Sequence, residues 1–265
     1  MWRYAFLQNI GFQTNFVDRM SICTVTGATG FIGSQLVRKL LANGETVRCL
    51  VRASSNTERL NGLDVELKLT DFSDGESLKQ GIQGSDIVYH CAGCIMSLRK
   101  AEMYQTNCEN TKRLAQVCMN SDSAPKLMYI SSLAAEKGTR LTDCTQPGNP
   151  ENSYQSGIYY VARDENPEYG ELGKLIGEKL GRKWTIAWHF SRPVFWIVFT
   201  ASEIFNQLRG RPSIINLDKA AEAISGSWIC SNKKAKRELG LKVKGDLPSL
   251  IEDIVAGYRA KGWLK

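Results

Sequence analysis

The sequence Gly27-Ala-Thr-Gly-Phe-Ile-Gly33 follows the β-prone run Ile22 to Thr26 and precedes an apolar-periodic segment that ends at Gly44. A strand, a glycine-rich turn and a helix in this order form the unit with which doubly wound α/β folds bind the pyrophosphate of a dinucleotide. The glycines allow a tight turn, close approach of backbone to pyrophosphate, and close packing of helix on strand, and the helix N-terminus offers unpaired N–H groups. The alternative is an ordinary βα turn. The predicted cofactor-binding residues here are Gly27, Thr29, Gly30, Phe31, Ile32 and Gly33.

Strand-like and helix-like segments continue to alternate beyond this unit. Further strands are predicted over 46–51, 65–69, 87–91 and 126–131, and a helix is predicted over about 101–119. Strands that alternate with helices build a parallel sheet covered by helices. We therefore expect an α/β domain of the Rossmann type, with a doubly wound parallel sheet.

The alternation is lost after residue 135. Glycine, proline and asparagine predict an exposed loop over 138–157, a short strand is predicted over 159–162, and apolar periodicity predicts helices over 168–180 and near the C-terminus. The second half of the chain is therefore predicted to form a small, mostly helical annex. The expected organisation is an N-terminal extension (1–19), a dinucleotide-binding domain (20–157) and a reduced substrate-binding domain (158–265).

The composition is that of a globular protein. Of the 265 residues, 43% are hydrophobic, and neither glycine nor charged residues recur at a fixed short period, which argues against a disordered, collagen-like or coiled-coil chain. The net charge is +7. Much of the positive charge lies in 233–244, where interleaved acidic residues favour a solvated helix face over a nucleic-acid site. The first 19 residues lack the apolar core of a signal peptide, and we expect no membrane span.

Cysteine usage indicates a reducing compartment. Several of the eight cysteines lie in apolar runs, which is typical of buried thiols in a cytoplasmic protein rather than of a disulfide framework. Cys91 and Cys94 form a C-x-x-C motif, but the chain has no second pair. We therefore expect no metal site.

The end of the second predicted strand bears on the choice of cofactor. An acidic residue there would bind the ribose 2′-hydroxyl of NAD, but the sequence reads Arg48-Cys-Leu-Val-Arg52. Arg52 can pair with a 2′-phosphate, with Arg59 assisting from the next turn. This favours NADP, with NAD as the alternative, unless Arg52 is only a solvated charge.

With these residues in place, the chain resembles the extended short-chain dehydrogenase/reductases, especially epimerase/dehydratase, dihydroflavonol-reductase-like and 3β-hydroxysteroid-dehydrogenase-like members. The likeness covers residues 21–135 and is carried by Thr26-Gly-Ala-Thr-Gly-Phe-Ile-Gly33, Asp71-Phe72, His90-Cys-Ala-Gly93, Asn107 with Thr111, and Tyr129-Ile-Ser-Ser132. The resemblance implies that Asp71 and Phe72 flank the adenine and that Ala92 and Gly93 line the nicotinamide ribose. It also implies that Ser131 or Ser132 polarises the substrate oxygen.

The family's catalytic tyrosine and lysine lie four residues apart on one helix, so that both face the same side and the ammonium lowers the pKa of the phenol. None of the nine tyrosines has a lysine four residues later. Tyr154 lies in a proline-led stretch like that before the family tyrosine, but Ile158 stands in the lysine position. Tyr159 is followed by Arg163, and Tyr169 has Lys174 one residue too far away.

Two explanations of this break are open. An internal deletion around residues 154–158 would remove the lysine, the rest of its helix and the sixth strand, and it would leave the sheet without part of its edge. An insertion of one residue at Tyr169 is the competing explanation. We favour the deletion, because the sequence after Tyr159 resembles a later segment of the family's sequences. An exposed sheet edge would allow pairing with a second copy, as in a homodimer.

The leading hypothesis is an NADP-preferring oxidoreductase or epimerase/dehydratase acting on the alcohol or carbonyl of a small hydrophobic or sugar-like substrate. Ser132 and Tyr154 are the expected catalytic residues, with weakened proton transfer. The alternative is an NADP-binding sensor or interaction protein without turnover, which the missing tyrosine–lysine pair supports.

Overall fold

The computed structural model describes residues 21–132, 157–186, 191–213, 215–224, 229–243, 245–260, 262 and 264. These residues form two compact units, which are treated separately below. The first unit contains residues 21–132 and 203–213, and the second contains residues 157–202 and the described residues from 215 onward. Tyr154, the expected proton donor, lies outside the described residues.

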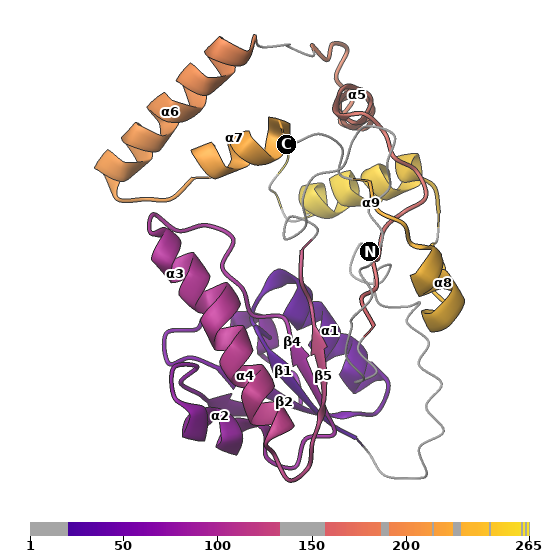
Figure 1. The fold of residues 1–265 in the computed structure, drawn as a ribbon. Coiled ribbons are helices and arrows are strands. Elements are labelled where there is room, and N and C mark those ends of the chain that lie inside the picture. Colours follow the sequence, from indigo (N-terminus) through magenta and orange to yellow (C-terminus); the bar gives the residue numbers. More distant parts are fainter. Residues whose placement is uncertain are drawn as a thin grey trace. The chain divides into compact units, whose positions relative to one another are not determined.

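The first unit is built on a parallel sheet (Figure 1). Its strands are β1 (Ile22–Thr26), β2 (Thr46–Val51), β3 (Glu66–Leu69), β4 (Ile87–His90) and β5 (Lys126–Tyr129), in the spatial order β3-β2-β1-β4-β5. Val25 at the centre of the sheet pairs with Cys49 on one side and with Tyr89 on the other. The strand order reverses between β1 and β4, which is where open α/β sheets bind their ligands. The predicted Rossmann-type sheet is confirmed.

The helices of the first unit connect these strands. They are α1 (Phe31–Ala42), α2 (Gly75–Ile82), α3 (Lys100–Tyr104) and α4 (Asn110–Met119), with a short 3-10 turn at Glu58–Leu60. The single helix predicted over about 101–119 is interrupted by a π-helical turn at Gln105–Glu109. Helix α2 begins where Asp74 accepts hydrogen bonds from the backbone N–H groups of Glu76 and Ser77.

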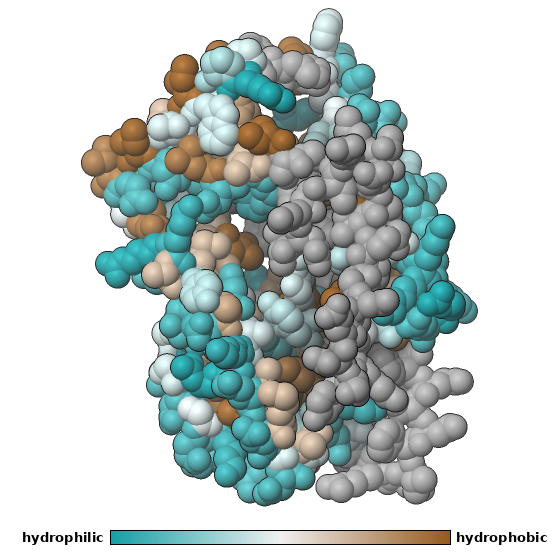
Figure 2. All heavy atoms as spheres, viewed as in Figure 1, coloured by the Kyte–Doolittle hydropathy of each residue, from teal (hydrophilic) through white to brown (hydrophobic). Residues whose placement is uncertain are grey.

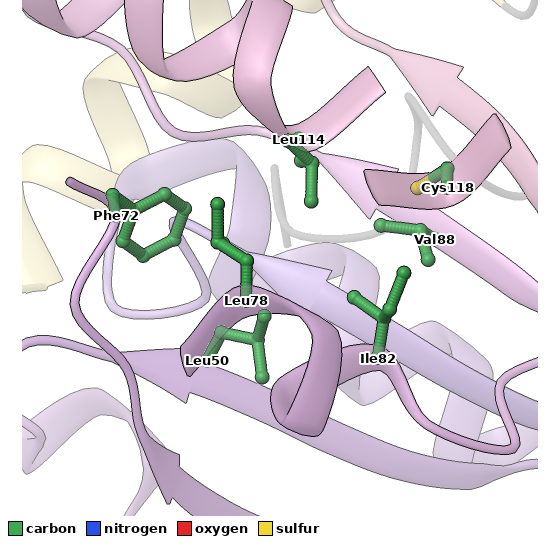
Figure 3. Packing of buried hydrophobic residues seen from close by; sticks show 7 residues of the cluster. All are labelled: Leu50, Phe72, Leu78, Ile82, Val88, Leu114 and Cys118. Atoms are coloured by element: carbon green, nitrogen blue, oxygen red, sulfur yellow. The ribbon is translucent and has the colours of Figure 1, made fainter. Parts of the chain in front are cut away.

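The core of the first unit lies between the sheet and helices α2 and α4 (Figure 3). Leu78 and Ile82 of α2 are four residues apart, as are Leu114 and Cys118 of α4, so each pair projects from one side of its helix. The cluster consists of Leu50, Phe72, Leu78, Ile82, Val88, Leu114 and Cys118. Because these side chains fix the strands and helices against one another, they hold the loops at the carboxyl ends of β1 and β4 in place.

The second unit and the segment that joins it to the first are mostly helical, as predicted. The helices are α5 (Tyr169–Lys179), α6 (Arg192–Arg209), α7 (Leu217–Ile224), α8 (Lys233–Leu239) and α9 (Leu247–Ala260). Helix α9 is capped by Asp246, whose carboxylate accepts from the backbone N–H of Ser249, and Lys179 of α5 pairs with Glu252 of α9 at 2.9 Å. The part of the chain that the structure describes contains no helix with the length and apolar character needed to cross a bilayer.

The prediction of a strand over 159–162 is wrong. Within the part of the chain that the structure describes, this segment has no regular secondary structure. The carbonyl oxygen of Ala162 instead accepts a hydrogen bond of 2.8 Å from the side-chain amide of Asn232, which also donates to the carboxylate of Asp164 at 2.9 Å. A side chain here satisfies a backbone group that a sheet would otherwise satisfy.

Candidate functional site

The glycine turn connects β1 directly to the N-terminus of α1. The backbone N–H of Gly30 donates to the carbonyl of Gly27 at 2.9 Å, and the N–H of Ser34 donates to the carbonyl of Gly30 at 3.1 Å. Gly30 occupies the N-cap position and offers no side chain to cap the helix. The first N–H groups of α1 have no acceptor within the helix, so this end of α1 can accept an anion.

Two of the glycines are required by close backbone contacts. Gly27 has φ +67°, and a Cβ atom there would lie 2.5 Å from the nitrogen of Ala92. A Cβ on Gly33 would lie 2.2 Å from the carbonyl oxygen of Gly27. The turn is therefore pressed between the start of α1 and the segment after β4, and any larger residue would push these apart.

Phe31 and Ile32 open helix α1 beside this turn. Both are exposed, and 72% of the Phe31 surface is accessible. Large apolar residues at the first turn of a helix usually pack against the preceding chain, so their exposure leaves the surface above the helix N-terminus apolar. Their backbone N–H groups lie in the same turn as those of Gly33.

His90 ties the ends of β1, β4 and α4 together. Its Nδ1 lies 2.6 Å from the hydroxyl of Thr26, and its Nε2 lies 2.9 Å from the hydroxyl of Thr111. The Thr26 hydroxyl also accepts a hydrogen bond of 3.3 Å from the N–H of Ala92. Burial lowers the pKa of the His90 imidazole from 6.5 to about 4, so the ring is neutral at pH 7. No separate role was predicted for His90 from the sequence, although a histidine at the end of a buried strand is a signal for a buried polar contact.

Asn107 holds the loop that follows Ala92 and Gly93. Its side-chain oxygen accepts from the N–H of Cys94 at 2.7 Å, and its amide nitrogen donates to the carbonyl of the same residue at 2.8 Å. Asn107 stands in the π-helical turn. Such turns are often found at functional sites, because the extra residue redirects a side chain.

Arg52 and Arg59, the predicted cationic residues, are both exposed. The backbone N–H of Arg52 donates to the Ser55 hydroxyl at 3.1 Å, which shapes the turn after β2. The guanidinium of Arg59 donates to the carbonyl of Thr29 at 3.4 Å. Arg59 therefore lies beside the glycine turn.

Asp71 and Phe72 follow β3, but only Asp71 presents its side chain to solvent. Its carboxylate accepts from the N–H and the hydroxyl of Ser73, and these hydrogen bonds lower its pKa. The ring of Phe72 is only 9% exposed and belongs to the core.

The residues expected to act on a substrate are only partly described. Ser131 and Ser132 directly follow β5 and are exposed, at the same edge of the sheet as the glycine turn. Tyr129, which sequence reasoning assigned no role, ends β5 and stacks on His90 with 5.3 Å between ring centroids.

The two other tyrosines considered for proton transfer lie in the second unit. The Tyr159 hydroxyl donates to the carboxylate of Glu238 at 3.0 Å, and this hydrogen bond raises the pKa of the phenol. The guanidinium of Arg163 pairs with Glu165 at 2.9 Å. Tyr169 is largely exposed at the start of α5. The ammonium of Lys234 lies 4.8 Å from the centroid of the Tyr159 ring.

Comparison with known proteins agrees with this geometry. Residues 23–163 match the model of the NAD dependent epimerase/dehydratase family. The chain is 36% identical over 114 residues to the sterol demethylase protein B of Methylococcus capsulatus, covering 42% of this chain and 34% of that protein. It is also 36% identical over 113 residues to a putative dihydroflavonol 4-reductase of Synechocystis sp., covering 42% of this chain and 32% of that protein. The match thus spans about a third of the length of these curated relatives.

Solved structures share the fold over most of the chain. A nucleoside-diphosphate-sugar epimerase from Pseudomonas aeruginosa has a TM-score of 0.62 at 17% identity and covers 93% of this chain and 100% of its own. The UDP-glucose 4-epimerase of Thermotoga maritima has a TM-score of 0.56 at 20% identity and covers 91% of this chain and 99% of its own. At these identities the likeness shows the fold.

Proposed function

This chain belongs to the NAD dependent epimerase/dehydratase family, and from this premise we propose that it is an oxidoreductase or epimerase/dehydratase that binds NADP at the Gly27–Gly33 turn. The observation that carries the proposal is the backbone cradle at this turn. The N-terminus of α1 has no side-chain cap, and Gly27 and Gly33 leave no room for a Cβ atom. A diphosphate fits such a cradle, because backbone N–H groups and the positive end of the helix dipole both favour an anion.

The preference for NADP over NAD is assigned to Arg52 and Arg59. A guanidinium can bind a 2′-phosphate through two parallel hydrogen bonds, whereas NAD recognition uses an acidic residue at the end of the second strand. Arg52 ends this strand region, and the contact of Arg59 with Thr29 places a second cation at the turn. Asp71 would lie on the adenine side, and Ala92 and Gly93 would lie beside the nicotinamide ribose.

The proposed reaction takes place at an alcohol or carbonyl carbon. When bound, the nicotinamide supplies or accepts the hydride. Ser132 would donate a hydrogen bond to the substrate oxygen and so stabilise the charge that develops there, and Tyr154 would exchange a proton with the same oxygen. Because Ile158 stands where the family has its lysine, no ammonium four residues after Tyr154 would assist proton transfer, and we expect slow turnover.

The substrate proposed is a small hydrophobic or sugar-like molecule. The names of the relatives include sterol and dihydroflavonol enzymes, which supports a rigid, largely apolar ring system bearing a hydroxyl or a ketone. The apolar surface of Phe31 and Ile32 beside the turn is compatible with such a substrate. We also propose that the protein works in the cytoplasm, since the seven cysteines of the described residues are free thiols.

A second function is favoured by the missing tyrosine–lysine pair. The chain would then bind NADP without turnover and act as a sensor or an interaction protein. In that case the cofactor site and its arginines are retained for binding alone.

Titration of the protein with NADPH and NADH tests the cofactor site. We expect saturable binding with preference for NADPH, and absence of binding for either nucleotide at millimolar concentrations would contradict both functions. Hydride transfer to a panel of ketones then separates them. Turnover that is lost in Tyr154→Phe while NADPH binding is kept supports the enzyme, whereas binding without transfer to any ketone supports the sensor.

A further inference from the structure

One side of α6 carries a continuous row of exposed apolar side chains, called here the α6 apolar face. Its members recur at positions i, i+3, i+4 and i+7, which places them on one side of a helix. They are Val194, Ile197, Val198, Ala201, Ile204, Phe205 and Leu208. Ile197 is 67% exposed and Leu208 is 82% exposed. Figure 2 shows the apolar side chains gathered over this helix.

The α6 apolar face is not the side by which the helix packs. Phe195 and Phe199 lie on the other side of α6, where they are half-buried and their ring centroids are 4.4 Å apart. The hydroxyl of Ser202, also on that side, donates to the carbonyl of Ile215 at 2.7 Å. Contiguous apolar surface that is left outside the packing usually marks an interaction site.

The charges around α6 are mostly positive. Residues 182–211 contain five lysines and arginines and a single acidic residue, Glu203, which is half-buried on the packing side. Arg192 and Arg209 stand at the two ends of the helix, and Arg211 follows. The guanidinium of Arg209 lies 5.2 Å from the centroid of the Phe205 ring, at the border of the apolar face.

We propose that the α6 apolar face rests on an anionic lipid bilayer. The arginines at the helix ends would meet the phosphate groups of the lipids, while the apolar side chains enter the boundary between headgroups and acyl chains. The face is about 21 Å long at 1.5 Å per residue, which suits a helix lying along the surface. This proposal is independent of the cofactor site.

A second copy of the chain suits this face less well. Two copies related by a twofold axis would pair their α6 helices either antiparallel, with Arg192 of one copy close to Arg209 of the other, or parallel, with each arginine close to its own counterpart. Like charges at both ends oppose either pairing, whereas an anionic surface neutralises both.

Flotation of the whole protein with vesicles tests the proposal. We expect it to float with phosphatidylcholine vesicles that contain phosphatidylglycerol, and to float less with pure phosphatidylcholine or at high salt. The double variant Ile197→Glu, Leu208→Glu should remain unbound. The matched control Thr200→Glu adds a carboxylate to the same helix at an exposed position outside the row and should bind like the unmodified chain, apart from a small effect of its charge.

Substitution of the arginines provides a second, independent test of the proposal. Arg209→Gln and Arg211→Gln should each lower the partition coefficient on anionic vesicles about fivefold and leave binding to neutral vesicles unchanged. Circular dichroism melting of every variant should match the unmodified chain, because the substituted side chains are exposed.

Three results would overturn the proposal. The first is an unmodified chain that does not float with anionic vesicles, and the second is a glutamate double variant that floats as well as the unmodified chain. The third is a lipid-free dimer, seen by sedimentation, that the double variant converts to a monomer, since the face would then join two copies.

Discussion

The space for a Cβ atom on Gly27 is filled by the backbone nitrogen of Ala92, 2.5 Å away, although 65 residues separate the two in sequence. The segment after β4 thus lies directly against the glycine turn. This contact leads to the first prediction.

Gly27→Ala should abolish or weaken NADPH binding by more than tenfold. The new methyl group must displace the backbone at residues 91–92, and the residue must also hold φ +67°, which alone costs about 1–2 kcal/mol. Gly44→Ala is the matched control, since Gly44 has φ +83° but nothing within 4 Å. Isothermal titration and thermal melting of both variants check this, and equal affinities would contradict it.

Arg52→Asp should move the ratio of the NADPH and NADH dissociation constants toward NADH by about tenfold or more. The change removes a charge-assisted hydrogen bond to the 2′-phosphate, worth about 1.5–3 kcal/mol, and adds a carboxylate that can accept from the ribose hydroxyl. Lys79→Asp makes the same charge change at an exposed position of α2 and should leave the ratio unaltered. A ratio that Arg52→Asp does not change would refute the role given to Arg52.

Protonation of His90 should destabilise the fold below neutral pH. The pKa of His90 is about 4 in the folded protein and has its ordinary value of 6.5 in the unfolded chain. Between pH 4 and pH 6.5 the unfolded chain therefore binds more protons than the folded protein. The free energy of unfolding should therefore be highest above pH 6.5 and fall by about 3 kcal/mol as the pH drops to 4. In His90→Gln this fall in the free energy of unfolding should be absent. Urea unfolding of both proteins across this range gives the difference, and parallel curves would show that His90 does not titrate as stated.

Truncation of a leucine should lower the free energy of unfolding substantially only where its side chain is buried. Leu78→Ala removes a fully buried side chain from the cluster between α2, α4 and the sheet, with an expected loss of about 2–5 kcal/mol of unfolding free energy. Leu69→Ala, at an exposed position of β3, should change it by no more than about 0.5 kcal/mol. Denaturant titration measures both, and similar losses would mean that the core is assigned wrongly.

The sheet could be predicted from sequence because each strand is a short β-prone run next to a glycine or to a segment with helical periodicity. Helix α2 was not predicted, since only eight residues form it and two are glycine, although Asp74 was a capping signal. The π-helical turn between α3 and α4 contains Asn107, whose contact with Cys94 is encoded in no local pattern. Helix α6 was not predicted, although Pro193 in its first turn is a helix start signal.

The candidate site was predictable to a similar degree. The glycine turn and the position of Arg52 follow from spacing within one βα unit. The hydrogen bonds of His90 with Thr26 and Thr111 join residues more than twenty positions apart, so they required the fold itself. The burial of Phe72 was hidden because its neighbour Asp71 has the character of a loop residue.

The π-helical turn at Gln105–Glu109 makes chain length, and not residue type alone, critical in this segment. Loss of Cys108 or Glu109, which lie between Asn107 and Thr111, would restore a regular helix and rotate the chain before the deletion by about 100° relative to the chain after it. Asn107 would then turn away from Cys94 while Thr111 kept its place beside His90. A single-codon deletion in this stretch should thus be more harmful than most substitutions in it.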